Sequence, residues 1–294
     1  MKEEIYLKTI LEALENDASN IELVSNTNNI VYKANTLKYG TVYIKFYLNQ
    51  SSHIDNEMNL YNILDKAYLK EVIFSSKKPR FAVFKEVKGK TLDELTDSEL
   101  ESLKEKIIDS VKCFYDTLSN VKIEGYGLLD ENLKGSSTNF KEFIIDRQMR
   151  TQELLKEYPV FCDVFSRIWK KYEDIITGDN SLVPIDTNAK NIMITDKEEI
   201  KFIDPGELIS APKLMGYGDF VAHIYKTPLY DCLINKLNLS VDDEKRLRIY
   251  AIFSSLNILA FLQDLGVKEL DKVIPYGNKY TFDELIKDHL KTLF

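Results

Sequence analysis

Residues 182–207 read LVPIDTNAKNIMITDKEEIKFIDPGE, and the assignment of the fold begins with them. Two short apolar runs, IMI and FI, flank the polar residues DKEE, a pattern that predicts a hairpin of two short strands. Asp186 and Asn191 precede the first strand, and Asp204 follows the second. Asp and Asn are also ordinary turn residues, because their side chains bond nearby backbone amides. Turn chemistry and a binding site are therefore both open at this point.

The binding-site alternative has a specific chemistry. A phosphoryl-transfer enzyme needs a cation on the nucleotide phosphates, oxygen ligands for magnesium, and a carboxylate near the attacking hydroxyl. Magnesium prefers hard oxygen ligands and takes few of them from protein. Asn191 and Asp204 could supply such oxygens, and Asp186 could orient or deprotonate an alcohol.

The cation is expected near the N-terminus. Lys45 lies within the strand-like run TVYIKFYL, where a lysine either faces solvent on an edge strand or reaches a buried anion. Glu57 follows twelve residues later, in the first turns of a predicted helix. A buried lysine–glutamate pair that joins a strand to a helix is the arrangement that holds a kinase lysine.

The composition of the 294 residues is that of a soluble globular protein, with 44% hydrophobic and 29% charged residues. Acids interrupt the first 17 residues, so they predict no signal peptide, and the longest apolar run, 249–262, is too short to cross a membrane. The three cysteines lie far apart and the three histidines lack metal-ligand spacing. We therefore expect a cytoplasmic protein with reduced thiols and no membrane partner.

Charge is distributed unevenly. Residues 1–89 hold 12 Lys and Arg against 11 Asp and Glu, and the remainder holds 27 against 36. An acidic C-terminal part disfavours nucleic acid as a partner and favours a small cationic one, although a merely soluble surface explains it equally simply.

The order of the predicted elements divides the chain at Gly89. Before it, we expect a helix, three strands, a second helix and two strands, at 1–17, 21–25, 30–34, 41–48, 54–69, 71–74 and 80–87. After it, we expect the hairpin and helices at 97–118, 138–157, 159–176, 217–237, 241–264 and 281–293. The prediction is an α+β fold with a small β-rich N-terminal lobe, 1–89, and a larger helical C-terminal lobe, 90–294.

Seven segments, in order, resemble the aminoglycoside phosphotransferase and choline kinase group, the small-molecule relatives of the protein kinases. They are SNTNNIVYKA, VYIKFY, NEMNLYNIL, FAVFKEVKGKTL, IDTNAKNIMI, IKFIDPGE and GYGDFVAHIY. The resemblance implies the bilobal protein-kinase-like fold and transfer of the γ-phosphate of ATP, or of another nucleoside triphosphate, to a hydroxyl of a small molecule. The candidate acceptors that it implies are aminoglycosides, amino alcohols and sugars.

The same resemblance implies a role for each matching residue. Asp186 is the expected catalytic residue, and Asn191 and Asp204 are the expected Mg2+ ligands. Asp219 is the expected brace for the catalytic loop, although it lies just inside a predicted helix start and could be only a helix cap. Nucleotide binding is expected from Lys45 with its partner Glu57, and from the side chains of Thr27 and Asn28. It is also expected from Phe84, the residue before the hinge, and from the backbone of Lys85 and Val87, which should meet the adenine edge.

Two departures from the family pattern keep an alternative open. Pro184 stands where a histidine usually precedes the catalytic aspartate, and residues 25–29 contain no glycine to bring backbone amides close to phosphates. A pseudokinase or nucleotide-binding regulatory protein without transfer activity is therefore the second hypothesis. Protein phosphorylation is disfavoured, because Asp219 follows Asp204 by only fifteen positions and no activation-segment motif lies between them.

Overall fold

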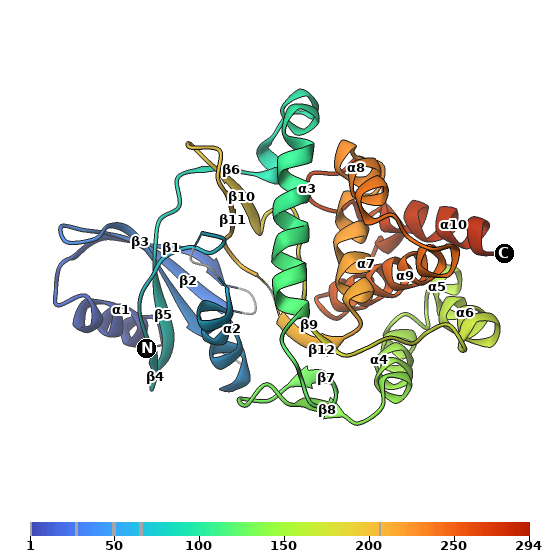
Figure 1. Cartoon of the computed structure of the whole chain (residues 1–294). Coiled ribbons are helices and arrows are strands. Elements are labelled where there is room, and N and C mark those ends of the chain that lie inside the picture. Colours follow the sequence, from blue (N-terminus) through green and yellow to red (C-terminus); the bar gives the residue numbers. More distant parts are fainter. Residues whose placement is uncertain (1, 27–28, 49–50, 65–66, 206) are drawn as a thin grey trace.

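The structure is a computed structural model, and it describes residues 2–26, 29–48, 51–64, 67–205 and 207–294. A sheet-rich N-terminal part and a mainly helical C-terminal part lie beside each other (Figure 1). Among the described residues, no helix combines the length and the apolarity that crossing a bilayer requires.

Five antiparallel strands form the N-terminal sheet in the order β1-β2-β3-β5-β4. The predicted β-β-β-α-β-β sequence of elements is confirmed, although the last strand ends two residues before the predicted boundary. The strands are β1 Ala18–Asn26, β2 Asn29–Thr36, β3 Gly40–Tyr47, β4 Val72–Lys77 and β5 Arg80–Lys85.

Each face of this sheet packs against one helix. Helix α1, Lys2–Ala13, packs Ile10 against the face that includes Ile44. Helix α2, Ser51–Ile63, packs Ile54 against Phe84 on the other face. Because side chains alternate along a strand, Lys45 points away from Ile44 and toward the side of α2.

The helices of the C-terminal part surround its main hydrophobic core. A capping box of Thr96 and Glu99 opens α3. The α-helices are α3 Asp97–Ser119, α4 Phe140–Leu154, α5 Pro159–Cys162, α6 Val164–Tyr172, α7 Lys213–Ile224, α8 Pro228–Leu237, α9 Val241–Asp264 and α10 Phe282–Leu293. Two short 3-10 helices, Leu92–Glu94 and Leu270–Lys272, join them.

Two of the predicted helices are each divided in two. The prediction of one helix over 217–237 was wrong, because α7 ends at Ile224 and Pro228 begins a new helix. The backbone before a proline avoids helical geometry. The segment 159–176 is likewise split at Asp163. Helix α7 also begins four residues earlier than predicted.

Two small sheets bring strands into the helical part. The predicted hairpin is present and pairs with β6 Gly89–Thr91, in the order β11-β10-β6, where β10 is Ile192–Thr195 and β11 is Ile200–Phe202. Gly89 thus begins a strand of the C-terminal hairpin sheet, and the lobe boundary at this residue stays a prediction.

The other small sheet was not predicted. Its order is β8-β7-β12-β9, with β7 Tyr126–Leu129, β8 Gly135–Ser137, β9 Ser181–Ile185 and β12 Glu207–Ala211. All five residues of β9 are buried, so the strand shows no alternation of polar and apolar residues that would reveal it. Strands β9 and β12 hold the two ends of residues 182–207 side by side.

Candidate active site

The open end of the hairpin brings two of the predicted residues together. Ile192 lies opposite Phe202 in the β10–β11 pair, and the backbone N–H of Ile203 donates to the carbonyl of Asn191 at 2.9 Å. Asn191 and Asp204 therefore stand at the same end of the two strands, as the sequence pattern predicted.

Asp186 has a backbone conformation that its neighbours hold in place. Its φ of 68° lies in the left-handed region, which Asp and Asn tolerate better than most residues. The Asn191 side-chain amide donates to the Asp186 carbonyl at 2.8 Å, and the Asn188 amide donates to the Asp186 carboxylate at 2.7 Å. Sequence reasoning missed Asn188, whose only signal was its position two residues after the candidate catalytic aspartate.

Asp219 braces this loop. Its side chain is buried, and Oδ2 accepts the backbone N–H of Thr187 at 3.1 Å while Oδ1 accepts the hydroxyl of Ser254 at 2.5 Å. The bracing contact predicted for Asp219 is therefore present, and a plain helix cap is excluded. Its predicted place at a helix start was wrong, since it is the seventh residue of α7. Tyr115 adds a second support through its hydroxyl, 2.9 Å from that of Thr187.

We expect Asp219→Ala to destabilise the protein by about 2 kcal/mol or more, because the change leaves a buried N–H and a buried hydroxyl without their acceptor. Urea unfolding at neutral pH measures the effect. The exposed Asp231→Ala on α8 is the matched control and should leave the unfolding midpoint unchanged. Equal midpoints for the two variants would contradict the bracing role.

Lys45 lies at the centre of a buried ionic cluster. Its Nζ is 2.8 Å from Glu57 Oε2 and 3.0 Å from Asp204 Oδ1, and the Tyr47 hydroxyl donates to the same Glu57 oxygen at 2.7 Å. Burial by itself lowers the pKa of Lys45, but the charges of Glu57 and Asp204 outweigh it and raise the pKa above the usual lysine value. The predicted Lys45–Glu57 pair is therefore present, and the edge-strand alternative is excluded.

The carboxyl group of Asp186 titrates near neutrality. Although its surface is exposed, the surrounding protein desolvates the group, and Asp219 and Asp204 add negative charge nearby; together these raise its pKa to about 7. The hydrogen bond from Asn188 opposes the rise, because it favours the ionised form.

This raised pKa predicts a pH-dependent cost to stability. The folded protein holds the Asp186 proton more tightly than the unfolded chain does, so ionisation destabilises the fold, and stability falls as pH rises from about 4 through about 7. We expect the free energy of unfolding of Asp186→Asn, relative to the parent protein, to increase over this window. Denaturant unfolding at pH 5 and pH 8 tests the expectation, and a pH-independent difference would contradict it.

Asp204 and Asn191 offer donors that fit a magnesium ion. Lys45 contacts Oδ1 of Asp204, while the Asp204 side chain remains 43% exposed, so its other oxygen is available as a ligand. Asn191 commits its amide nitrogen to the Asp186 carbonyl, so its oxygen is the end available as a ligand. Among the described residues, no group of three or more His, Cys, Asp or Glu could hold a metal. Asp204 and Asn191 together therefore suit an ion that takes few ligands from protein and most of its coordination from phosphates and water.

The predicted hinge begins within β5, because Phe84 and Lys85 are the last two residues of that strand. The Lys85 N–H donates to the Glu71 carbonyl at 2.9 Å and the Glu86 N–H to the Thr41 carbonyl at 3.0 Å. Among the described residues, no hydrogen-bond partner is found for the Val87 backbone N–H. Contact of Lys85 and Val87 with a nucleotide stays a prediction. Thr27 and Asn28, predicted to meet the phosphates, lie outside the described residues.

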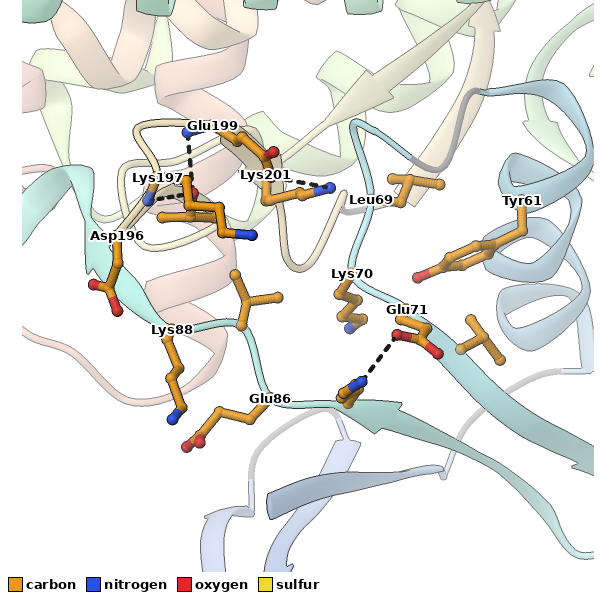
Figure 2. A pocket seen from close by; sticks show the side chains of 14 residues that line it. Tyr61, Leu69, Lys70, Glu71, Glu86, Lys88, Asp196, Lys197, Glu199 and Lys201 are labelled. Carbon is orange, nitrogen blue, oxygen red and sulfur yellow. Dashed lines mark hydrogen bonds and ion pairs between the residues drawn. The ribbon is translucent and has the colours of Figure 1, made fainter. Parts of the chain in front are cut away.

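A cavity of about 770 Å3 lies along the hinge (Figure 2). Its walls are the hinge residues 85–88, the segment 69–72 before and at the start of β4, and the hairpin turn. Taken over the described residues, the lining does not include Lys45, Asp186 or Asp204. The cavity is therefore separate from the cluster of candidate catalytic residues.

Three solved structures resemble this arrangement over nearly the whole chain. A thermostable mutant of aminoglycoside phosphotransferase APH(4)-Ia, in ternary complex with AMP-PNP and hygromycin B, has a TM-score of 0.72 at 13% identity and covers 97% of each chain. Choline kinase LicA from Streptococcus pneumoniae has a TM-score of 0.67 at 15% identity, covering 100% of this chain and 99% of that chain. Plasmodium vivax ethanolamine kinase has a TM-score of 0.57 at 14% identity, covering 98% and 85%.

The chain has the protein-kinase-like fold of these small-molecule kinases. No protein-family model and no curated protein sequence matches the chain. The fold predicted from seven short motifs is thus confirmed by three-dimensional similarity at identities of 13–15%.

In this kinase-like fold, Pro184, which stands where the family pattern usually has a histidine, is accommodated within a strand. Pro184 is buried in β9 and lies opposite Leu208 of β12. In the loop after β9, Asn188 and Asn191 donate hydrogen bonds to Asp186. The backbone N–H of Thr187 donates to Asp219. A proline two residues before Asp186 is therefore compatible with an ordered catalytic loop.

Proposed function

We propose that the protein is an ATP- and magnesium-dependent phosphotransferase that moves the γ-phosphate to a hydroxyl of a small, cationic molecule. The observation that carries this proposal is the contact of Lys45 with both Glu57 and Asp204, because it joins the N-terminal sheet to the open end of the C-terminal hairpin. A buried ion pair is seldom kept for stability, since desolvation offsets most of the attraction. The names of the structural neighbours, which are aminoglycoside, choline and ethanolamine kinases, support the same reaction class.

The nucleotide is proposed to lie between the two parts of the chain. Phe84 closes the inner end of its site, and the backbone of Lys85 and Val87 meets the adenine edge. Phosphate binding by the side chains of Thr27 and Asn28, which lie outside the described residues, is part of the same proposal. Lys45, held by Glu57, neutralises phosphate charge. Asn191 and Asp204 would hold Mg2+, which when bound supplies charge neutralisation on the phosphates.

Asp186 is proposed to position the acceptor hydroxyl. The transferring phosphoryl group needs little help from a strong base, so orientation of the nucleophile is the main contribution. The Asn188 hydrogen bond fixes the carboxylate rotamer, and a pKa near 7 keeps a substantial part of it ionised and able to accept the hydroxyl proton at neutral pH.

The acceptor class is inferred from charge. The net acidity of residues 90–294 favours a cation such as an aminoglycoside or an amino alcohol over a neutral sugar. Hygromycin B is bound in the neighbouring aminoglycoside phosphotransferase structure, and it supports the class of acceptor only.

An ATP-consumption screen over small alcohols tests the proposal. Aminoglycosides, choline, ethanolamine and neutral sugars are each incubated with the protein, ATP and Mg2+, and the phosphorylated product is identified by mass spectrometry. Phosphate transfer to a cationic alcohol is the expected result. Nucleotide binding without transfer to any acceptor would favour the pseudokinase alternative, and failure to bind nucleotide would refute both.

We expect Lys45→Met to lower kcat/KM for ATP by about 10- to 100-fold, the scale of one charge-assisted hydrogen bond. Methionine keeps the length of the side chain, so circular dichroism should show an intact fold. Lys8→Met on the exposed face of α1 provides a control that should keep full activity. Parental activity in Lys45→Met would exclude a phosphate-binding role.

A further inference from the structure

Glu57 has a second cationic neighbour that the kinase-like cluster does not require. Lys70 Nζ lies 3.4 Å from Glu57 Oε1, on the carboxylate oxygen that Lys45 and Tyr47 leave free. Both side chains are buried, at 11% exposure for Lys70 and 5% for Glu57. The same ammonium stands 3.6 Å from the centre of the Phe84 ring, a cation–π contact with the residue at the inner end of the hinge.

The position of Lys70 is fixed by its backbone neighbours. Leu69 forms a parallel bridge with Phe202, two residues before Asp204, and the Tyr68 carbonyl accepts the Phe202 N–H at 2.8 Å. On the other side, the Glu71 carbonyl accepts the Lys85 N–H. Lys70 therefore sits between the strand that ends near Asp204 and the hinge, at the inner wall of the cavity in Figure 2.

The charges explain why a second lysine is useful. Two buried or partly buried cations, Lys45 and Lys70, face two carboxylates, Glu57 and Asp204. When Lys45 also contacts the nucleotide phosphates, Glu57 shares its nearest cation with them. A second cation beside Glu57 is then favourable, because an unpaired buried carboxylate is costly. Burial favours the neutral form of Glu57, yet Lys45 and then Lys70 outweigh it and hold the pKa below the usual range.

Burial also disfavours the charged form of Lys70, and here the neighbouring charges do not outweigh it. Desolvation lowers its pKa, and Glu57 restores only part of the loss. Its ammonium is therefore held at this position against a cost of burial that the Glu57 and Phe84 contacts offset only in part.

We propose that Lys70 is a positioning residue, which acts as the second counter-ion of Glu57 and thereby keeps Lys45 aimed at the nucleotide phosphates. It touches neither phosphate nor acceptor. This inference rests on the proposed function, since it assigns Lys70 a part in nucleotide use by the same site.

The test is a double-mutant cycle on Lys70→Met and Glu57→Gln. Methionine keeps an unbranched apolar side chain and removes the ammonium together with its contacts to Glu57 and to the Phe84 ring. We expect Lys70→Met to raise Kd for Mg·AMP-PNP, measured by calorimetry, by about 5- to 10-fold, the scale of one charged contact of this length. If Lys70 acts through Glu57, the double variant should bind no more weakly than Glu57→Gln alone. Lys70→Arg should recover most of the loss.

Lys197→Met is the control, because Lys197 lines the same cavity and makes no ion pair with a described residue. It should bind as the parent does. Parental binding by Lys70→Met, or losses that add in full in the double variant, would overturn the proposal. If Lys70→Met fails to fold, the same cycle run with Lys70→Gln decides between these outcomes. A parent protein that binds Mg·AMP-PNP but phosphorylates no alcohol would refute the phosphotransferase proposal while the cycle still decides the role of Lys70.

Discussion

Asp204→Ala should abolish magnesium-dependent nucleotide binding. Asp204, at the open end of the hairpin, combines contact with Lys45 and partial exposure, and its loss leaves Asn191 as the single remaining proposed metal ligand. A neutral amide alone is a weak ligand for an ion that binds charged oxygens and gives up its water reluctantly. Lys45 keeps Glu57 as its partner, so the fold should survive the change.

Calorimetric titration with AMP-PNP, with and without Mg2+, measures this effect. The parent protein should bind more tightly when Mg2+ is present, and Asp204→Ala should show no such gain. Asp196→Ala serves as the control, because it removes an exposed carboxylate from the turn of the same hairpin. If magnesium strengthens nucleotide binding equally in Asp204→Ala and the parent, the metal-ligand assignment fails and turn chemistry becomes the better account of this residue.

Asp186→Asn should separate nucleotide binding from transfer. Asparagine tolerates the left-handed backbone that Asp186 adopts and keeps its shape, so the loop and ATP binding should remain near normal. The neutral amide neither accepts the hydroxyl proton nor orients the nucleophile as the carboxylate does. We therefore expect kcat to fall by about 10² to 10⁴, the range of a general acid–base contribution.

Single-turnover kinetics with the acceptor found in the screen provide the measurement, and Asp174→Asn, an exposed aspartate on the loop after α6, is the control. The parent rate should rise with pH through about 7 as Asp186 ionises, and the variant should lose this dependence. Parental rates in Asp186→Asn would show that this carboxylate does not act on the acceptor.

Local patterns in the sequence were sufficient for the elements that carry the site. The β-β-β-α-β-β order, the hairpin around residues 196–199 and the spacing of Lys45 and Glu57 follow from alternation, turn residues and helical periodicity. Each of these features involves residues that are close along the chain, so near neighbours determine it. The fold itself was reached from the order of seven motifs, and the structural neighbours confirm it.

Other features depended on packing between distant segments. The N–H of Thr187 finds Asp219 32 residues later, and Lys45 meets Asp204 across 159 positions. The buried strands β9 and β12 show no alternation of polar and apolar residues, and helix α7 begins before the point that its periodicity indicated. The sequence pattern did not single out Lys70, because a lysine's sequence neighbours do not reveal that its ammonium is buried. Only the packing of α2, the hinge and β11 around it placed that charge against Glu57 and Phe84.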